Sequence, residues 1–173
     1  IFDKNILEDL EDRHDARVNF IYNTIQNLHE QLQQLGSSML IKYGDPIKIW
    51  KELAKKYPIK TVFTNRDYEP YALKRDKEIS SFLESNNIEV ANFKDQVVFE
   101  KDEILKGDGK PYTVYTPYKN KWLAKFNEDG IEKSKDKHIE WEHLCQYETL
   151  FPTLETIGFM KSKQKVHSPN LTV

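Results

Sequence analysis

Apolar residues recur along the chain at two spacings, and their alternation predicts the architecture. Between residues 15 and 35 they recur at steps of three and four, which is one face of an amphipathic helix. The stripe consists of Val18, Ile21, Ile25, Leu28, Leu32 and Leu35, with Phe20 widening it. The spacing is also heptad-like, so a coiled-coil seam of fewer than three heptads is the alternative.

Short β-prone runs alternate with further helical stretches after this helix. Residues 38–43 and 61–64 predict strands, and 88–90 starts the last clear one. Helices are expected at 46–57 and 70–84, because Pro46 and Pro70 suit the first turn of a helix. The alternation indicates βαβ units and a three-layer α/β/α, Rossmann-like fold with a mostly parallel, doubly wound sheet.

Both ends of the chain depart from this pattern. Residues 1–3 resemble the end of a strand, so the first βα unit is expected to be missing. After residue 95 we expect an extended segment at 112–115, a helix from Thr116, and a short helix at 139–150. Residues 127–137 are a polar linker, and 162–173 are expected to be disordered. The predicted domains are therefore 1–126 and 127–173.

Composition narrows the functional classes without selecting one. The net charge of −2 gives no general attraction to nucleic acid or to an anionic membrane. The lone cysteine, Cys145, cannot form an internal disulfide and fits a reducing, cytoplasmic compartment. No apolar run approaches the length of a membrane span. We expect no metal site, because His138 and His143 do not share a helical face as an i, i+4 pair would.

The polar turn at 65–69 is the sharpest candidate for chemistry. It follows a predicted strand and carries Arg66, Asp67, Tyr68 and Glu69. Ligands of open α/β sheets bind at the carboxyl ends of the strands, so the turn is placed to line a pocket. The alternative is a solvated turn whose carboxylates favour the start of the next helix. Arg75 and Asp76, further along that helix, are read as a structural ion pair.

Two segments carry a resemblance to a known family. Residues 65–76, NRDYEPYALKRD, resemble the EPYARxRD signature of the amino-terminal domain of DNA photolyases and cryptochromes. Residues 109–123, GKPYTVYTPYKNKWL, resemble the segment that closes that domain. The resemblance implies a light-harvesting (antenna) domain whose first strand, central to the family's sheet, is absent. Exchange of that strand between two copies would produce an oligomer.

The resemblance also implies which residues bind a cofactor. Asp3, Arg17, Asp67 and Glu69 match an antenna pocket for a chromophore of the deazaflavin or flavin type. A planar guanidinium suits such an anionic ring system. Folate is doubtful, because Tyr71 and Ala72 stand where folate-binding members have an Asn-Glu pair. No catalytic residue is assigned.

The function implied for the intact parent is light-driven repair of pyrimidine dimers in DNA. The parent would be a carbon–carbon lyase with FAD, and it would contact damaged DNA through a helical domain absent from these residues. The fragment alone is expected to be inactive. Two alternatives stay open: a cryptochrome-type photoreceptor domain, and a free-standing module that binds a nucleotide or a partner.

Overall fold

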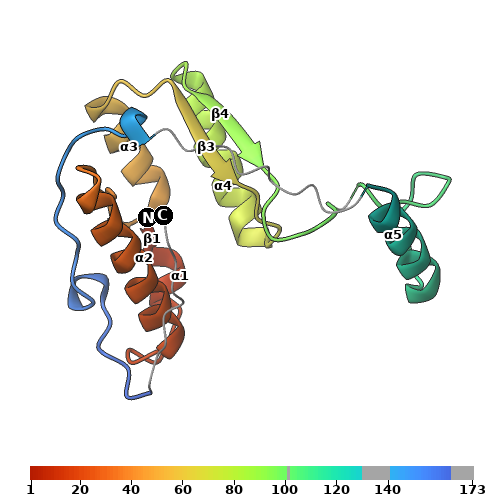
Figure 1. Cartoon of the computed structure of the whole chain (residues 1–173), viewed down its shortest axis with the longest axis horizontal. Helices are drawn as coiled ribbons and strands as arrows, with labels where there is room; N and C mark the ends of the chain where they lie inside the picture. The colour runs from red at the N-terminus through yellow and green to blue at the C-terminus, as the bar shows by residue number, and fades with distance from the viewer. Residues whose placement is uncertain (101, 130–140, 165–173) are drawn as a thin grey trace.

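The structure, a computed structural model, describes residues 1–100, 102–129 and 141–164. Among these residues four short strands form two separate parallel pairs (Figure 1). In the first pair, β1 (Phe2–Asp3) lies beside β2 (Tyr43–Gly44). In the second, β3 (Thr61–Asn65) lies beside β4 (Glu89–Phe93). The mixed α/β class with parallel pairing is confirmed, but the expected continuous sheet is divided into two.

The helices predicted from residues 15, 46, 70 and 116 begin within one residue of those positions. The α-helices of the described residues are α1 (Lys4–Glu8), α2 (Ala16–Gln34), α3 (Pro46–Lys56), α4 (Pro70–Ser85) and α5 (Tyr115–Asp129). Side chains of Asp3, Asp15 and Asp45 accept backbone N–H groups at the starts of α1, α2 and α3. Proline occupies the first turn of α3 and of α4. None of these helices has the length and apolar character needed to cross a bilayer.

Helix α2 packs within the chain, on a face that differs from the predicted stripe. Val18 is buried and Ile25 half-buried, but Ile21 and Leu35 are exposed. The buried side continues through Tyr22 and His29, both of which contact the ring of Phe151. The buried face of α2 therefore contacts Phe151, in a later part of the same chain.

Residues 144–162 run back along the β1–β2 half of the molecule. Ile157 and Phe159 are fully buried in a core with Phe2, Leu7 and Val18. The predicted helix at 139–150 is wrong for the residues described: a 3-10 turn spans Trp141–His143, and 144–150 carry no helix. Residues 127–129 of the predicted linker are the last residues of α5, so that prediction is wrong there, and 162–164 of the predicted tail are described. The remainder of the two predictions, at 130–137 and 165–173, lies outside the described residues. The division at 126/127 therefore stays a prediction.

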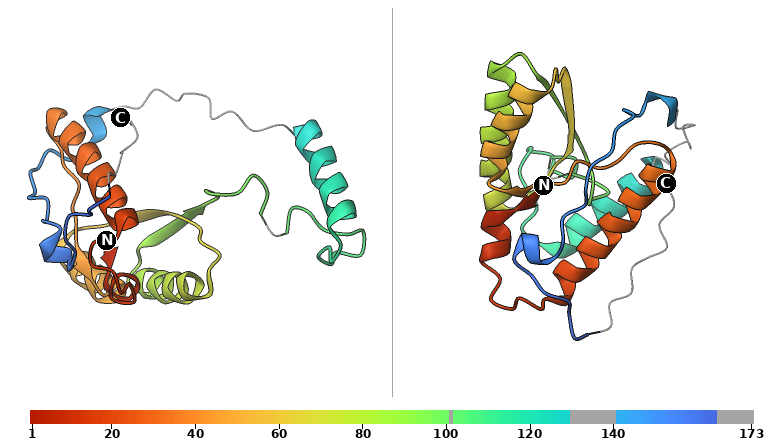
Figure 2. Two further views of the ribbon diagram at one scale, coloured as in Figure 1. Left: turned by 90° about the horizontal axis from the view of Figure 1, so that it is seen from below. Right: turned by 90° about the vertical axis from the view of Figure 1, so that its left-hand side faces the viewer.

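Helices α3 and α4 lie side by side and connect the two strand pairs (Figure 2). On α3, Ile49 approaches Gly44 of β2, whereas Trp50 and Ala54 join the core of Val62, Leu83 and Ile88 around β3 and β4. Helix α5 stands apart from both pairs and has no buried residue (Figure 1). The layer formed by α3 and α4 therefore packs against both strand pairs, which are separated from each other by a gap.

Candidate functional site at the carboxyl ends of the strands

The carboxyl end of β1 is joined to helix α4 by a polar cluster. Asp3, only 8% exposed, accepts the backbone N–H of Asn5 at 3.0 Å and the Tyr71 hydroxyl at 2.8 Å. Asn5 Nδ2 donates to the Tyr71 oxygen at 3.0 Å. Burial is the main cause that raises the pKa of Tyr71, and the bond to Asp3 acts in the same direction. Asp3 therefore fixes β1, α1 and α4 at one point.

Arg75 completes this cluster. Its Nη1 lies 3.6 Å from Asp3 Oδ2, and its Nε donates to Asp76 Oδ1 at 2.7 Å. The guanidinium also lies over the ring of Tyr71, 5.6 Å from its centroid. The predicted ion pair of Arg75 and Asp76 is confirmed. The structure adds Asp3 as a second carboxylate partner, which spacing in the sequence could not reveal.

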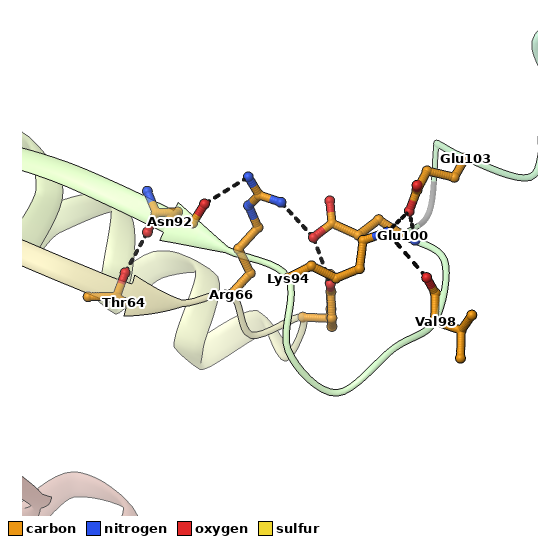
Figure 3. Close-up of polar contacts among 8 residues, drawn as sticks. Thr64, Arg66, Asn92, Lys94, Val98, Glu100 and Glu103 are labelled. Carbon is orange, nitrogen blue, oxygen red and sulfur yellow. Dashed lines mark hydrogen bonds and ion pairs between the residues drawn. The ribbon is translucent and has the colours of Figure 1, made fainter. Parts of the chain in front are cut away.

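A second cluster lies at the carboxyl ends of β3 and β4 (Figure 3). Arg66 donates from Nη1 to Glu100 at 2.6 Å and from Nη2 to the Asn92 carbonyl at 3.2 Å. The Tyr68 hydroxyl donates to the same Glu100 oxygen at 3.1 Å. The bond from Arg66 lowers the pKa of Glu100, and burial together with Glu100 raises the pKa of Tyr68. Arg66 and Tyr68 of the candidate turn thus hold the loop after β4.

Lys94 and Glu103 extend this second cluster into that loop. Lys94 Nζ binds Glu103 Oε2 and the Val98 carbonyl, and Glu103 also accepts the backbone N–H of Glu100 (Figure 3). The ammonium groups of Lys94 and Lys125 both lie near the ring of Phe99, at 6.0 and 5.5 Å from its centroid. Lys125 belongs to α5, so the loop also forms the junction to that helix.

The four residues implied as an antenna pocket do not all meet. Asp67 accepts the backbone N–H groups of Tyr68 and Glu69 and so shapes the turn. Glu69 is the N-cap residue of α4, directly before Pro70, and is exposed. Both follow β3, which belongs to a different strand pair from β1 and Asp3. Arg17 lies at the start of α2, where its side chain, 76% exposed, forms an ion pair with Asp15 at 2.6 Å.

A cavity of about 310 Å³ opens between the two strand pairs. Its polar part includes Asp3, Arg75, Asp76, Thr64 and Asn65, and its apolar part includes Ile1, Trp50, Ile79, Leu83 and Val90. Asp3 is the member of the implied antenna set that lines it. Sequence reasoning missed the cavity and the role of Tyr71. The position of Tyr71 one residue after Pro70, on the first turn of the helix, was the available signal.

Comparison with known proteins assigns the family. The model of the DNA photolyase family matches residues 1–137. A deoxyribodipyrimidine photo-lyase of Synechococcus is 35% identical over 149 residues, covering 83% of this chain and 31% of the relative. One from Halobacterium salinarum is 25% identical over 150 residues, covering 87% of this chain and 31% of the relative. The chain therefore spans about a third of the length of these relatives.

A solved structure supports the same fold. A class III photolyase of Agrobacterium tumefaciens superposes with a TM-score of 0.62 at 22% identity, over 90% of this chain and 31% of that one. At 22% identity, this structural similarity is evidence for the fold alone. With the family match over residues 1–137, it establishes that the chain belongs to the DNA photolyase family, as an amino-terminal α/β domain.

Proposed function

We propose that this chain is the antenna-chromophore domain of a light-driven DNA-repair flavoprotein. The photo-lyase names of its relatives support repair of deoxyribodipyrimidines as the activity of the parent. FAD and damaged DNA would be bound by polypeptide outside these 173 residues. The fragment alone would split no dimers.

The observation that carries the antenna assignment is that Asp3, at the end of β1, and Asn65, at the end of β3, line one cavity. Asp67 and Glu69 lie in the turn that follows Asn65, and open α/β sheets bind their ligands beyond the carboxyl ends of parallel strands. Carboxylates can accept the ring N–H of a flavin or deazaflavin, and the exposed Arg17 guanidinium has the freedom to turn from Asp15 to an anionic ring. The chromophore would supply absorption of light.

A chromophore of the flavin or deazaflavin type is favoured over folate. Ala72 is 3% exposed and has no polar atom in its side chain, so it offers a pterin ring nothing to bind. The Tyr71 hydroxyl is already engaged by Asp3. The two positions that differ from the folate-binding pattern are thus used for packing and for joining β1 to α4.

Titration of the chain with 8-hydroxy-5-deazaflavin, FMN and a reduced folate tests this assignment. We expect saturable quenching of the flavin or deazaflavin fluorescence and none for the folate. Arg17→Gln and Asp67→Ala should each weaken binding about tenfold, which corresponds to about 1.4 kcal/mol. Glu84→Gln, at the opposite end of α4, is the matched control. Unchanged affinity would remove the mutated residue from the pocket, and no saturation with either flavin would overturn the antenna function.

A further inference from the structure

Helix α5 carries a row of aromatic side chains that the described residues leave open. Tyr115, Tyr118 and Trp122 lie at steps of three and four, which is one face of the helix. Tyr115 is 72% exposed and Tyr118 is 38% exposed, on a helix that stands apart from both strand pairs (Figure 1). A groove of about 340 Å³, within the size range of ligand sites, follows this face. We call its lining residues the aromatic stripe: Tyr115, Tyr118, Lys119, Trp122 and Leu123.

Two rings of the stripe are held in place by neighbouring rings. The indole of Trp122 stacks on Phe126, with 5.1 Å between centroids and 12° between the ring planes. Phe99, in the loop after β4, contacts the same indole edge-on at 5.4 Å. The ring of Tyr118 contacts Tyr112 at 6.1 Å. Because these contacts already restrict the side chains, a ligand that stacks on them would lose little of its binding free energy to ordering them.

The stretch that contains the stripe is locally basic, although the whole chain has a net charge of −2. Residues 109–127 contain four lysines and no Asp or Glu. With 28 carboxylates in 173 residues, about three would be expected in a stretch of this length. Lys125 is paired with Asp129 at 2.6 Å. Lys119 and Lys121 are exposed, and no described carboxylate lies within ion-pair distance of either. Their ammonium groups are therefore available to an anion.

Open aromatic rings beside unpaired ammonium groups favour one chemical class of ligand. An apolar protein surface would have to remove water from Lys119, which lies within the stripe. A cationic ligand, which aromatic rings also bind, would be repelled by the same ammonium group. Bases joined by phosphates satisfy both parts, because each base has a face that stacks and each phosphate is an anion. Tyr115 and Trp122 are about 10 Å apart along the helix axis, which is about three nucleotides at 3.4 Å each.

We propose that the aromatic stripe binds a short segment of single-stranded DNA, whose bases stack on Tyr115, Tyr118 and Trp122 and whose phosphates contact Lys119 and Lys121. Such binding is independent of base sequence, since stacking requires only a π-face. It is a contact to an undamaged strand, separate from the binding of the dimer that is proposed for polypeptide outside residues 1–173. It requires no chromophore, so its test can fail or succeed independently of the antenna function.

Fluorescence anisotropy of a fluorescein-labelled, twelve-nucleotide oligothymidylate is the first test, with the unmodified chain free of chromophore. We expect saturable binding with a Kd of about 10 μM at low salt. Thymidine monophosphate should compete at least tenfold less well than the unlabelled oligonucleotide, because it cannot contact several rings at once. The duplex with oligodeoxyadenylate should also compete at least tenfold less well, because its bases are already stacked and paired. No saturation, or equal competition by the mononucleotide or the duplex, would overturn the proposal.

Variants of Tyr115 test the stacking, because this exposed side chain can be changed without disturbing a core. Tyr115→Ala should weaken binding of the oligonucleotide at least fivefold, the lower end of the range for loss of one stacked base. Tyr115→Phe keeps the ring and should bind within twofold of the unmodified chain. Phe63→Ala removes an aromatic ring of β3 that is 71% exposed, and is the control for aromatic rings elsewhere. Equal binding by Tyr115→Ala and Tyr115→Phe would contradict stacking at this position.

The salt dependence of binding tests the two lysines. Each phosphate contact to a single strand contributes about 0.7 to the slope of log Kd against log salt concentration. The double variant Lys119→Gln, Lys121→Gln should therefore lower this slope by about 1.4. The double variant Lys74→Gln, Lys77→Gln, at exposed lysines of α4, is the matched control and should leave the slope unchanged. The same slope in both double variants would remove Lys119 and Lys121 from the site.

Photocrosslinking locates the bound strand, with a central 5-iodouracil in the oligonucleotide and mass spectrometry of the digested protein. We expect crosslinks to the aromatic stripe, at Tyr115, Tyr118 or Trp122, in residues 1–173 and in the full product of the gene. Crosslinks confined to other residues would overturn the proposal. Crosslinking of the stripe in residues 1–173 but not in the full product would also overturn it, because further polypeptide would then cover α5.

Discussion

The hydroxyl of Tyr71 on α4 donates a 2.8 Å hydrogen bond to the carboxylate of Asp3 at the end of β1, 68 positions earlier in the chain. This bond crosses from the half of the molecule that contains β1 and β2 to the half that contains β3 and β4. It therefore joins the two strand pairs through α4, together with the longer contact of Arg75 to the same carboxylate.

Tyr71→Phe should lower the free energy of unfolding by about 1 kcal/mol, because it deletes one hydrogen bond to a largely buried carboxylate. Urea denaturation followed by far-UV circular dichroism measures the change. Tyr115→Phe, at an exposed tyrosine that begins α5, is the matched control and should cost nothing measurable. Equal stability of the two variants would show that the bond between Tyr71 and Asp3 does not stabilise the fold.

Asp15 predicts a specific loss of stability in acid. The hydrogen bond from the Arg17 side chain is the main cause that lowers the pKa of Asp15 from 3.8 to about 2. The unfolded chain therefore binds a proton at a higher pH than the folded one. The stabilisation is fully present above about pH 5 and is lost as the pH falls through 3.8 toward 2.

Asp15→Asn tests this dependence, because asparagine is an equally good N-cap for α2 but cannot titrate. The variant should show a smaller decline in stability between pH 5 and pH 2 than the unmodified chain. Asp12→Asn, at a nearby carboxylate that accepts the His14 N–H, controls for general charge effects. The same decline in Asp15→Asn and the unmodified chain would refute the assignment.

Gly36 ends α2 in the left-handed region, with φ of 78°. A Cβ at this position would be strained and would also meet the side-chain amide of Gln146. Gly36→Ala should cost about 1 kcal/mol of the free energy of unfolding. Gly107→Ala is the matched control, since a Cβ there meets no atom within 4 Å and needs no positive φ. Thermal unfolding distinguishes the two, and a Tm of Gly36→Ala no lower than that of Gly107→Ala would count against the assignment.

Phe159 packs residues 157–159 against β1 of the first strand pair. Its side chain is 1% exposed in the core with Phe2 and Val18, so Phe159→Ala should lower the free energy of unfolding by about 3–5 kcal/mol. Leu150→Ala, at a leucine that is 95% exposed, should have almost no effect. If Phe159→Ala is too unstable to isolate, Ile157→Val at the adjacent core position should cost about 1 kcal/mol. Urea unfolding that is unaffected by both core variants would mean that residues 157–159 do not pack on β1.

The helices could be predicted from the sequence because their signals are local. Asp45 with Pro46, and Pro70 alone, mark starts that the structure places at the same residues. The ion pair of Arg75 with Asp76 is equally local. The partnership with Asp3 was not predictable from spacing, because it depends on how α4 packs against β1.

The strand predicted at 38–43, in contrast, was wrong for most of its length, because non-local contacts decide its structure. Only Tyr43 of that run lies in β2. The Ser38 hydroxyl instead donates to the Tyr147 carbonyl at 3.0 Å, and Thr149 donates to the Met39 carbonyl at 2.8 Å. The residues of the predicted strand and of the predicted helix at 139–150 thus contact one another through side-chain hydroxyls, a pairing over about 110 positions that no local pattern encodes.

The sequence pattern also did not predict that the sheet divides into two separate pairs. A missing first βα unit was inferred, and two separate parallel pairs are what the structure shows. Helix α3 packs against both pairs, since Ile49 lies near Gly44 of β2 and Trp50 joins the core around β3 and β4.

Light-dependent repair by the full product of the gene that encodes this chain is the decisive test of the proposed repair function. A thymine-dimer oligonucleotide would be illuminated with blue light or kept in the dark, with the full product and with residues 1–173 alone. We predict that the full product contains FAD and splits the dimer in light only, while residues 1–173 split none. A flavin-free product, a flavoprotein that repairs nothing, or repair by residues 1–173 alone would contradict it.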